Sequence, residues 1–333
     1  MTECRDKKEE LIRLENVNLT FDKKTALFDK GRRVHVLKDV NLTVYKGEII
    51  AVVGESGCGK TSLGRVITGI TRPSSGKIFF EGKSTVGVFD KDIRSFRKVQ
   101  FIQQDSYAAL NPVNTIYQSL YAPIKTHHRD WKKPQIDQRI EYLMDLIGLT
   151  PTAQYLSKYP HQLSGGQRQR ILMARALSLD PELIVADEPV SMIDVSLRLS
   201  LLNLMSSLNQ RLGVSFLYIT HDLSTARFIA RNGRMCVMYL GEIVEEGDLE
   251  QVLSHPRHPY TQALIKAVPS PDPLANTDEP LPLKSFELTD IERRPAGCAF
   301  APRCLYADRQ CEEDVECRNI DGVTVKCCKV KYD

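Results

Sequence analysis

The sequence predicts an α/β fold, and three features of the chain support this. Residues 11–53 alternate apolar and polar side chains over several short runs, a pattern typical of β-strands. The runs "ELIVADEP" and "GVSFLYITHD" are apolar with few polar interruptions, as expected for central strands of a parallel sheet that is covered on both faces. From about residue 94 to residue 175 the pattern becomes mostly helical. We therefore expect a parallel sheet combined with helices.

The composition limits the class of protein. The chain has 333 residues, with 42% hydrophobic and 26% charged side chains, so it can bury a full-sized core without disulfide staples. A net charge of +3 is too small to indicate a nucleic-acid partner. The longest apolar runs have the length of buried strands, and the charged N-terminus differs from an apolar signal peptide. We expect a cytosolic chain, with any membrane spans supplied by other chains.

The chain is expected to divide into three parts. Residues 1–268 would form the main domain, with a helical subdomain at about 94–175. Residues 269–285 are rich in proline and acidic side chains, which suits a linker or an extended arm. Residues 286–333 would form a small cysteine-rich domain. Because each motif described below occurs once, the chain is expected to hold a single nucleotide-binding unit.

The stretch "GESGCGKT" is the strongest single signal in the sequence. It fits the pattern G-x-x-x-x-G-K-[ST], and a strand pattern precedes it while a helical pattern follows, as this motif requires. Its glycines let backbone N–H groups wrap around phosphates, and the helix that follows adds the positive end of its dipole. Lys60 should reach the β- and γ-phosphates, Thr61 should bind Mg²⁺, and Ser62 can add a phosphate contact. The expected contacts of this loop are Gly54, Glu55, Ser56, Gly57, Cys58, Gly59, Lys60, Thr61 and Ser62.

Two acidic residues, Asp187 and Glu188, end the apolar run "ELIVADEP". At a strand tip near the phosphate loop, Asp187 can hold Mg²⁺, through a water molecule. Glu188 is then placed to polarise the water that attacks the nucleotide. Taken without the other motifs, the pair is better explained as an acidic cap at a strand end, because exposed acids usually face water.

A second glycine-rich helix start occurs in "LSGGQRQR". Its Ser164, Gly165, Gly166 and Gln167 would free backbone N–H groups at the start of the helix "QRQRILMARALSL". One γ-phosphate cannot use two such sites from one compact subunit unless the sites face each other. We therefore expect a dimer, in which the phosphate loop of one subunit opposes the Ser-Gly-Gly of the other.

The ordered set of motifs resembles that of ABC transporter ATPases. Over residues 11–268 it comprises the loop at 54–61, Gln104, "LSGGQ", "LIVADEP", "SMIDVS" and His221 in "ITHD". The resemblance implies a P-loop ABC nucleotide-binding domain, with a RecA-like core, an antiparallel β subdomain and a helical subdomain, that binds and hydrolyses ATP with Mg²⁺.

The resemblance also implies roles for individual residues. Gln104 would touch Mg²⁺ or the attacking water and couple to a membrane subunit, with Gln103 as the neighbour that can be mistaken for it. His221 would contact the γ-phosphate, although outside this motif a satisfied core histidine would be preferred. Phe21 would stack on adenine, and a core phenylalanine explains this residue equally well. Asp194 would lie at the dimer seam.

The dimer-seam motif departs from the usual family pattern. It reads "SMIDVS" where relatives usually have "SALDVS", so Met192 is bulkier than the usual alanine and Ile193 has a different shape from the usual leucine. Because of this departure, the sequence does not define how the side chains pack at the dimer seam. The chemical role expected for Asp194 there is unchanged.

Three further stretches narrow the resemblance to one branch of the family. "YAALNP", "SHPRHPYTQALIKAVPSPDP" and "GCAFAPRC" are similar to segments of ATPases from oligopeptide and dipeptide importers, a layout that nickel importers and some oligosaccharide importers share. The branch implies two membrane permease subunits, a second ATPase that is a paralogue or an identical copy, an extracellular solute-binding protein, and a peripheral position on the cytoplasmic face of the cell membrane.

Two other classes of protein are alternatives to an importer. A soluble ABC ATPase of repair needs long coiled-coil insertions, and no sustained heptads occur here. A soluble ABC ATPase of translation carries two ATPase cassettes in one chain, and this chain has one. A redox sensor with an ATPase core is the second alternative, although the intact ATPase motifs make sensing at most secondary.

The carboxyl-terminal 36 residues contain six of the nine cysteines. No C-x-x-C pair occurs among them, so spacing alone leaves both a soft-metal site and a set of buried thiols open. The family resemblance implies a [4Fe–4S] cluster bound by Cys298, Cys304, Cys311 and Cys327. Cys317 or Cys328 remains an alternative fourth ligand.

Overall fold

The structure, a computed structural model, describes residues 9–23, 32–85, 98–268, 281–287 and 289–330. Most of the linker expected at 269–285 therefore lies outside the described residues. The chain forms two compact units, which are described separately: 1–9, 45–48 and 87–218 make the first, and 10–44, 49–86 and 219–333 make the second. The domain boundaries expected from the sequence stay a prediction. None of the described helices is both long enough and apolar enough to cross a membrane.

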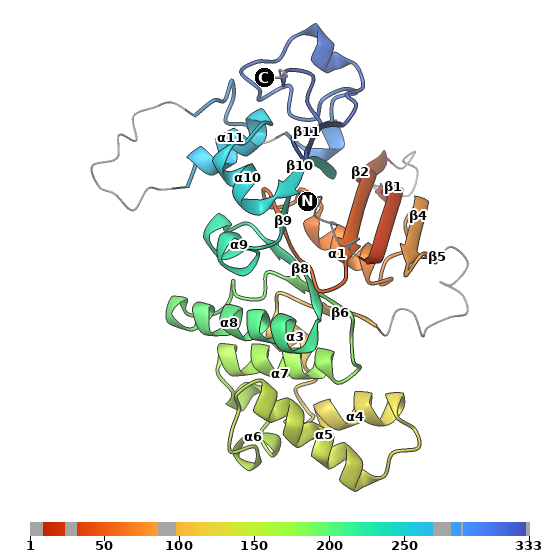
Figure 1. The fold of residues 1–333 in the computed structure, drawn as a ribbon, viewed down its shortest axis with the longest axis vertical. Coiled ribbons are helices and arrows are strands. Elements are labelled where there is room, and N and C mark those ends of the chain that lie inside the picture. The colour runs from red at the N-terminus through yellow and green to blue at the C-terminus, as the bar shows by residue number, and fades with distance from the viewer. Residues whose placement is uncertain (1–8, 24–31, 86–97, 269–280, 288, 331–333) are drawn as a thin grey trace, which may run out of the picture. The chain divides into compact units, whose positions relative to one another are not determined.

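The first unit places helices beside a short parallel sheet (Figure 1). Strand β7 (Leu183–Asp187) lies between β6 (Val99–Ile102), with which it pairs in parallel, and β8 (Ser215–Thr220). Every residue of β7 and β8 is buried, which confirms the prediction of central strands for the two apolar runs. The helices of this unit are α3 (Ser106–Ala109), α4 (Ile116–His127), α5 (Lys133–Leu146), α6 (Ala153–Leu156), α7 (Gly165–Leu177) and α8 (Val195–Leu212), with a 3-10 turn at Pro160–Gln162.

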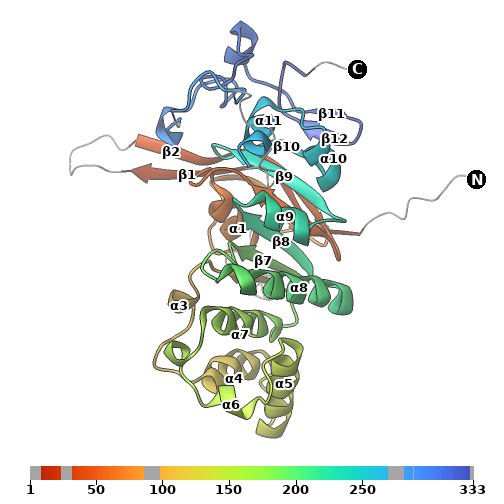
Figure 2. The same cartoon turned by 90° about the vertical axis from the view of Figure 1, so that its left-hand side faces the viewer.

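The second unit contains an antiparallel sheet of order β2-β1-β4-β5, whose long strands β1 and β2 lie side by side (Figure 2). A second set of strands follows the order β11-β12-β10-β9-β3, in which β3 and β9 are parallel. The strands are β1 (Glu10–Lys23), β2 (Arg32–Tyr45), β3 (Ile49–Val53), β4 (Ser75–Phe80), β5 (Lys83–Ser84), β9 (Arg234–Tyr239), β10 (Glu242–Asp248), β11 (Arg318–Ile320) and β12 (Val323–Val325). The helices are α1 (Lys60–Ile67), α9 (Leu223–Ile229), α10 (Leu249–Ser254) and α11 (Pro259–Lys266), with 3-10 turns at Ile291–Arg293 and Arg309–Glu312.

The cysteine-rich segment belongs to this second unit. Its strand β12 pairs antiparallel with β10, and the Lys326 amide donates to the Val244 carbonyl at 2.9 Å. A buried carboxylate adds charge pairing, since Glu242 Oε1 lies 3.0 Å from Lys326 Nζ and 2.9 Å from Arg294 Nη2. These contacts join the segment to strands of the nucleotide-binding part, and the separate small domain expected for residues 286–333 is not confirmed.

Helix α11 begins at the "HPY" sequence for local reasons. His258 is its N-cap, and its Nδ1 accepts a hydrogen bond from the Tyr260 amide at 3.0 Å. Pro259 occupies the first helical position, where its missing N–H has no helical partner to lose. The buried Glu245 carboxylate accepts from the amides of Arg257 and His258 at 2.8 and 2.9 Å. Burial lowers the pKa of His258 to about 3 and raises the pKa of Glu245.

The buried His258 predicts a pH-dependent loss of stability. The pKa of a histidine is near 6.5 in the unfolded chain, and the pKa of His258 is about 3 in the folded chain. Below about pH 6.5 the unfolded state therefore binds a proton at this residue that the folded state does not bind. The free energy of unfolding should therefore fall by about 2 kcal/mol between pH 7 and pH 5 from this group alone. His258→Asn keeps a capping side chain without the titration, and should flatten the pH dependence measured by denaturant unfolding.

The matched control for this prediction is His255→Asn, at an exposed histidine three residues earlier. The control should keep the wild-type pH dependence. An unchanged slope in His258→Asn would show that another group controls acid stability.

Candidate nucleotide site

The phosphate loop connects β3 to α1, and close backbone approaches fix its glycines. Gly59, the N-cap of α1, has φ 104°, and a Cβ there would lie 2.8 Å from the Val36 carbonyl oxygen. At Gly54 a Cβ would lie 2.2 Å from the Met238 carbonyl oxygen. No side chain fits at either position, so the loop can follow neighbouring backbone closely and leave its own N–H groups for a ligand.

Lys60 lies across the inside of this loop. Its Nζ donates to the carbonyls of Gly54 at 2.7 Å and Glu55 at 2.9 Å, and the side chain is buried. The ammonium therefore lies against the backbone carbonyls of the first two residues of the loop. Thr61 is exposed and Ser62 is half-buried in the first turn of α1. The thiol of Cys58 is buried, which raises its pKa, so this cysteine is an inert part of the loop.

Two residues from distant parts of the chain hold Glu55 in the loop. The Glu55 amide donates to the hydroxyl of Tyr260, in the first turn of α11, at 2.9 Å. Arg303 Nη1 donates to both carboxylate oxygens of Glu55, at 2.9 Å each. Sequence reasoning did not assign a role to Tyr260 or Arg303. The signal was present, because both lie in the branch-specific stretches "HPYTQAL" and "GCAFAPRC".

The first unit holds the two acidic residues that are expected to bind Mg²⁺ and to act on the attacking water. Asp187 ends β7 and is buried, and Glu188 follows it with a φ of 45°. Gln104 Nε2 donates to Glu188 Oε2 at 2.9 Å, so the structure brings together two of the predicted site residues. The Ser191 hydroxyl donates to the Glu188 carbonyl at 2.9 Å. A left-handed backbone is costly for a glutamate, and such strain concentrates at functional sites.

The "LSGGQ" motif starts α7, as predicted. Ser164 is the N-cap, and it forms a capping box with Gln167: the Gln167 amide donates to Ser164 Oγ at 3.3 Å, and the Ser164 amide donates to Gln167 Oε1 at 3.0 Å. A Cβ on Gly165 would lie 3.3 Å from the Met192 carbonyl oxygen, so the motif and "SMIDVS" are close in the same chain. The remaining N–H groups at the start of this 13-residue helix are suited to a phosphate.

Two arginines connect α7 to the segment that follows Gln104. The Arg168 guanidinium lies 3.5 Å from the centre of the Tyr107 ring, and its Nε donates to Ser106 Oγ at 3.4 Å. Arg175 Nη1 donates to the Ala109 carbonyl at 2.6 Å. The branch-specific "YAALNP" stretch is thus attached to the helix that begins at "LSGGQ".

The remaining predicted residues are exposed. Asp194 is exposed at the start of α8, and His221 is exposed after β8. Phe21 is 50% exposed near the end of β1, which favours a surface residue over a core one. Of the two unusual residues in "SMIDVS", Ile193 is buried and Met192 is 60% exposed, so Met192 is the one that changes the surface.

The cysteines of the C-terminal segment converge. No disulfide joins the eight cysteines that the structure describes. Burial, followed by the neighbouring thiols of Cys327, Cys311 and Cys304, raises the pKa of Cys298 to about 12. The Sγ atoms of Cys311 and Cys328 are 3.5 Å apart. Cys317 is exposed, and the charged groups that act on it are Lys326, Glu242 and Glu246 rather than other thiols.

The spacing of these sulfurs bears on which metal group they fit. A single zinc bound by thiolates at about 2.3 Å needs sulfurs only about 3.8 Å apart. Among the described residues, no three cysteine sulfurs lie within 4.8 Å of one another. Thiolates are the ligands of both zinc sites and iron–sulfur clusters.

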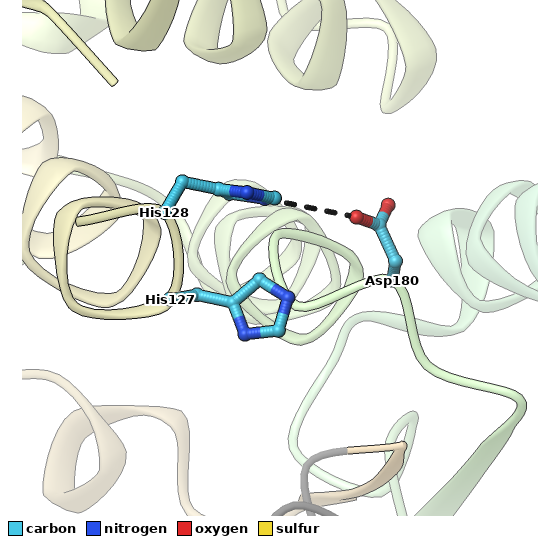
Figure 3. Close-up of side chains that lie close together, drawn as sticks. All are labelled: His127, His128 and Asp180. Atoms are coloured by element: carbon cyan, nitrogen blue, oxygen red, sulfur yellow. Dashed lines mark ion pairs between the residues drawn. The ribbon is translucent and has the colours of Figure 1, made fainter. Parts of the chain in front are cut away.

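A separate group of metal-binding residue types occurs in the first unit, where His127, His128 and Asp180 lie together (Figure 3). His128 Nε2 is 3.9 Å from Asp180 Oδ2, and the His128 ring stacks on Trp131 with centroids 3.7 Å apart. Arg139 donates to the same carboxylate, so Asp180 already has a cationic partner. Burial lowers the pKa of His128, which favours the neutral ring. This arrangement is explained by packing and charge pairing.

Comparisons with known proteins agree with this geometry. Residues 37–191 match the ABC transporter family, and residues 244–311 match the family described as "Oligopeptide/dipeptide transporter, C-terminal region". Among solved structures, the dimeric ATP-binding cassette MJ0796 bound to ADP and Pi is similar with a TM-score of 0.62 and 28% identity, covering 72% of this chain and 99% of that one.

Curated relatives resemble the chain over nearly its whole length. It is 38% identical over 307 residues to the oligopeptide transport ATP-binding protein OppF of Salmonella typhimurium, covering 91% of each chain. It is 41% identical over 310 residues to the dipeptide transport ATP-binding protein DppF of Haemophilus influenzae, covering 91% of this chain and 92% of that one. The chain therefore belongs to the oligopeptide and dipeptide transport ATP-binding proteins of the ABC transporter family.

Proposed function

We propose that this chain is the ATP-binding and ATP-hydrolysing subunit of an importer for oligopeptides or dipeptides. The observation that carries the proposal is the match of residues 244–311 to the C-terminal region of oligopeptide and dipeptide transporters. That region is not an appendage to a general ATPase, because its Tyr260 and Arg303 contact Glu55 inside the phosphate loop. Relatives named for oligopeptide and for dipeptide transport match about equally well, so the proposal covers both.

The proposed partners follow from this role. Two permease subunits would supply the membrane spans, and an extracellular solute-binding protein would deliver the cargo. A second ATPase, a paralogue or an identical copy, would complete each nucleotide site with its own Ser-Gly-Gly. The exposed Ser164 at the start of α7 and the dimeric state of the similar cassette MJ0796 support this pairing. The chain would act as a peripheral subunit on the cytoplasmic face of the cell membrane.

In the proposed site, the loop binds the phosphates of ATP, and the two acidic residues act on Mg²⁺ and on the attacking water. The loop amides of residues 54–62 and the Lys60 ammonium would bind the phosphates, while Thr61, Gln104 and Asp187 would hold Mg²⁺, which neutralises the charge that develops on the phosphates. His221 would contact the γ-phosphate and Phe21 would stack on adenine. Asp194 would lie at the dimer seam.

Glu188 is the proposed general base for the attacking water. Its carboxylate lies directly after the buried Asp187, and the Gln104 amide orients it at 2.9 Å. A carboxylate held in this way can accept the proton that the water loses as it attacks the γ-phosphate. Phosphoryl transfer otherwise depends on position and charge, which Lys60 and the backbone amides supply.

Replacement of Glu188 by glutamine should separate binding from hydrolysis. Glu188→Gln keeps the shape and an oxygen that can accept from Gln104, but it cannot take a proton. ATP affinity should remain within about twofold of wild type, while turnover should fall by at least about a hundredfold. The measurement is phosphate release by the assembled transporter, with binding followed separately by a fluorescent ATP analogue.

The matched control for Glu188→Gln is Glu141→Gln, on the exposed face of α5 in the same unit. It should leave both binding and turnover unchanged. Retained turnover in Glu188→Gln would remove Glu188 from the role of base.

We also propose that Cys298, Cys304, Cys311 and Cys327 bind a [4Fe–4S] cluster. Soft thiolates lie close to one another there, since the thiols of Cys327, Cys311 and Cys304 all act on Cys298, and thiolates are the usual ligands of such a cluster. When bound, the cluster would join the loop at Cys298–Cys311 to the β12 end of the segment. The close approach of Cys328 to Cys311 keeps Cys328 as the alternative to Cys327.

Metal analysis of the anaerobically purified chain tests the cluster. The protein should be brown and contain about four irons per chain. Cys311→Ser should lose most of the iron, whereas Cys317→Ser, at the exposed cysteine, should keep it. A colourless protein with one zinc per chain, or equal loss of iron in both variants, would contradict this ligand set.

A further inference from the structure

We propose that Arg303, in the cysteine-rich segment, is a positioning residue for ATP binding that acts through Glu55 of the phosphate loop. The inference rests on the proposed binding of ATP by this loop. It assigns to the C-terminal segment a direct part in shaping the nucleotide site.

The contact is close, charged and shielded. A single nitrogen, Arg303 Nη1, lies 2.9 Å from each oxygen of the Glu55 carboxylate. The Arg303 side chain is 7% exposed and that of Glu55 is 30% exposed. Charge-assisted hydrogen bonds of this kind are stronger than neutral ones, and partial burial reduces their screening by salt.

Glu55 is an unfavourable residue for a loop that binds anions. It follows Gly54 directly, and its carbonyl accepts from Lys60, the residue expected to reach the phosphates. An uncompensated carboxylate this close would repel a triphosphate. Arg303 cancels that charge and draws the side chain toward itself, while Tyr260 fixes the Glu55 backbone through the amide.

Arg303 itself is held in a well-packed position. Its guanidinium carbon lies 5.9 Å from the centre of the Tyr239 ring and 5.8 Å from that of Phe300, and the rings of Tyr239 and Tyr260 are 4.6 Å apart. The Arg303 carbonyl accepts from the Lys284 amide at 2.8 Å. The guanidinium therefore reaches Glu55 from a fixed backbone rather than from a free surface arm.

Its neighbour in the chain connects this contact to the cysteine site. Cys304 follows Arg303 directly, and its amide donates to the Phe300 carbonyl at 3.0 Å. A shift of the chain at Cys304 would move Arg303 and the ring of Phe300 together. The conformation of the cysteine-rich segment thus determines whether Arg303 can pair with the Glu55 carboxylate in the phosphate loop.

Four variants of the full chain test the proposal by titration with a fluorescent ATP analogue and by steady-state hydrolysis in the assembled transporter. Arg303→Met keeps the apolar stem and loses the charge, and it should weaken nucleotide binding by about tenfold. Arg303→Lys should bind nearly as well as wild type, because one ammonium nitrogen can take the place of Nη1. Glu55→Gln is the background for the double variant Glu55→Gln/Arg303→Met, in which the loss of Arg303 should weaken binding much less than it does in wild type, because the charge that Arg303 cancels is gone.

The kinetic signature separates positioning from general damage. KM for ATP should rise in Arg303→Met while kcat at saturating ATP stays close to wild type, because the contact affects binding and not the attacking water. Should Arg303→Met fail to fold, Arg303→Gln makes the same test, since its amide can donate to Glu55 without charge.

Two results would overturn the proposal: wild-type affinity in Arg303→Met, or a double variant that binds as weakly as Arg303→Met alone. The variant Lys60→Ala distinguishes a failure of the Arg303 proposal from a failure of the proposed ATP-binding function. If Lys60→Ala binds the nucleotide as well as wild type does, the loop is not the ATP site. If only Lys60→Ala loses binding and Arg303→Met does not, the loop binds ATP without help from Arg303.

Discussion

The phosphate loop can close around Lys60 only because glycines occupy the positions where neighbouring backbone comes closest. A side chain at Gly54 or Gly59 would collide with the carbonyl of Met238 or Val36. The loop is therefore held by β9 and β2 as much as by its own hydrogen bonds. Its conformation sets where Lys60 lies and where Glu55 points, and the contacts from α11 and from the cysteine-rich segment act on that fixed shape.

Much of the fold and site follows from local sequence. Continuous apolar runs predicted the buried strands β7 and β8, and the strand–glycine–helix pattern predicted the phosphate loop and α1. The "LSGGQ" pattern predicted the helix start at Ser164, where a capping box now explains the serine and the glutamine. These features depend on residues close together in the chain, so periodicity and capping rules can identify them.

Contacts between distant segments could not be predicted in this way. Arg303 and Glu55 are 248 residues apart, and Tyr260 and Glu55 are 205 apart. The stretches "HPYTQAL" and "PRC" served as family markers, but nothing in their composition showed that they would meet in the loop. The expected separate cysteine-rich domain was not confirmed for a similar reason, since the pairing of β12 with β10 is a tertiary contact. The pairing of these two strands connects the cysteine segment physically to the ATPase. Within the segment, Cys304 is next to Arg303, so an interaction that orders Cys304 also orders Arg303.

Reconstitution of transport tests the central claim most directly. The chain would be combined with its permeases, the second ATPase and the solute-binding protein in lipid vesicles, and uptake of a labelled di- or oligopeptide would be measured with ATP supplied on the side of the ATPases. Peptide uptake should require ATP and should stop when this chain is omitted or replaced by its Glu188→Gln variant. Peptide uptake that proceeds unchanged without this chain, or a complex that transports another solute and ignores peptides, would contradict it.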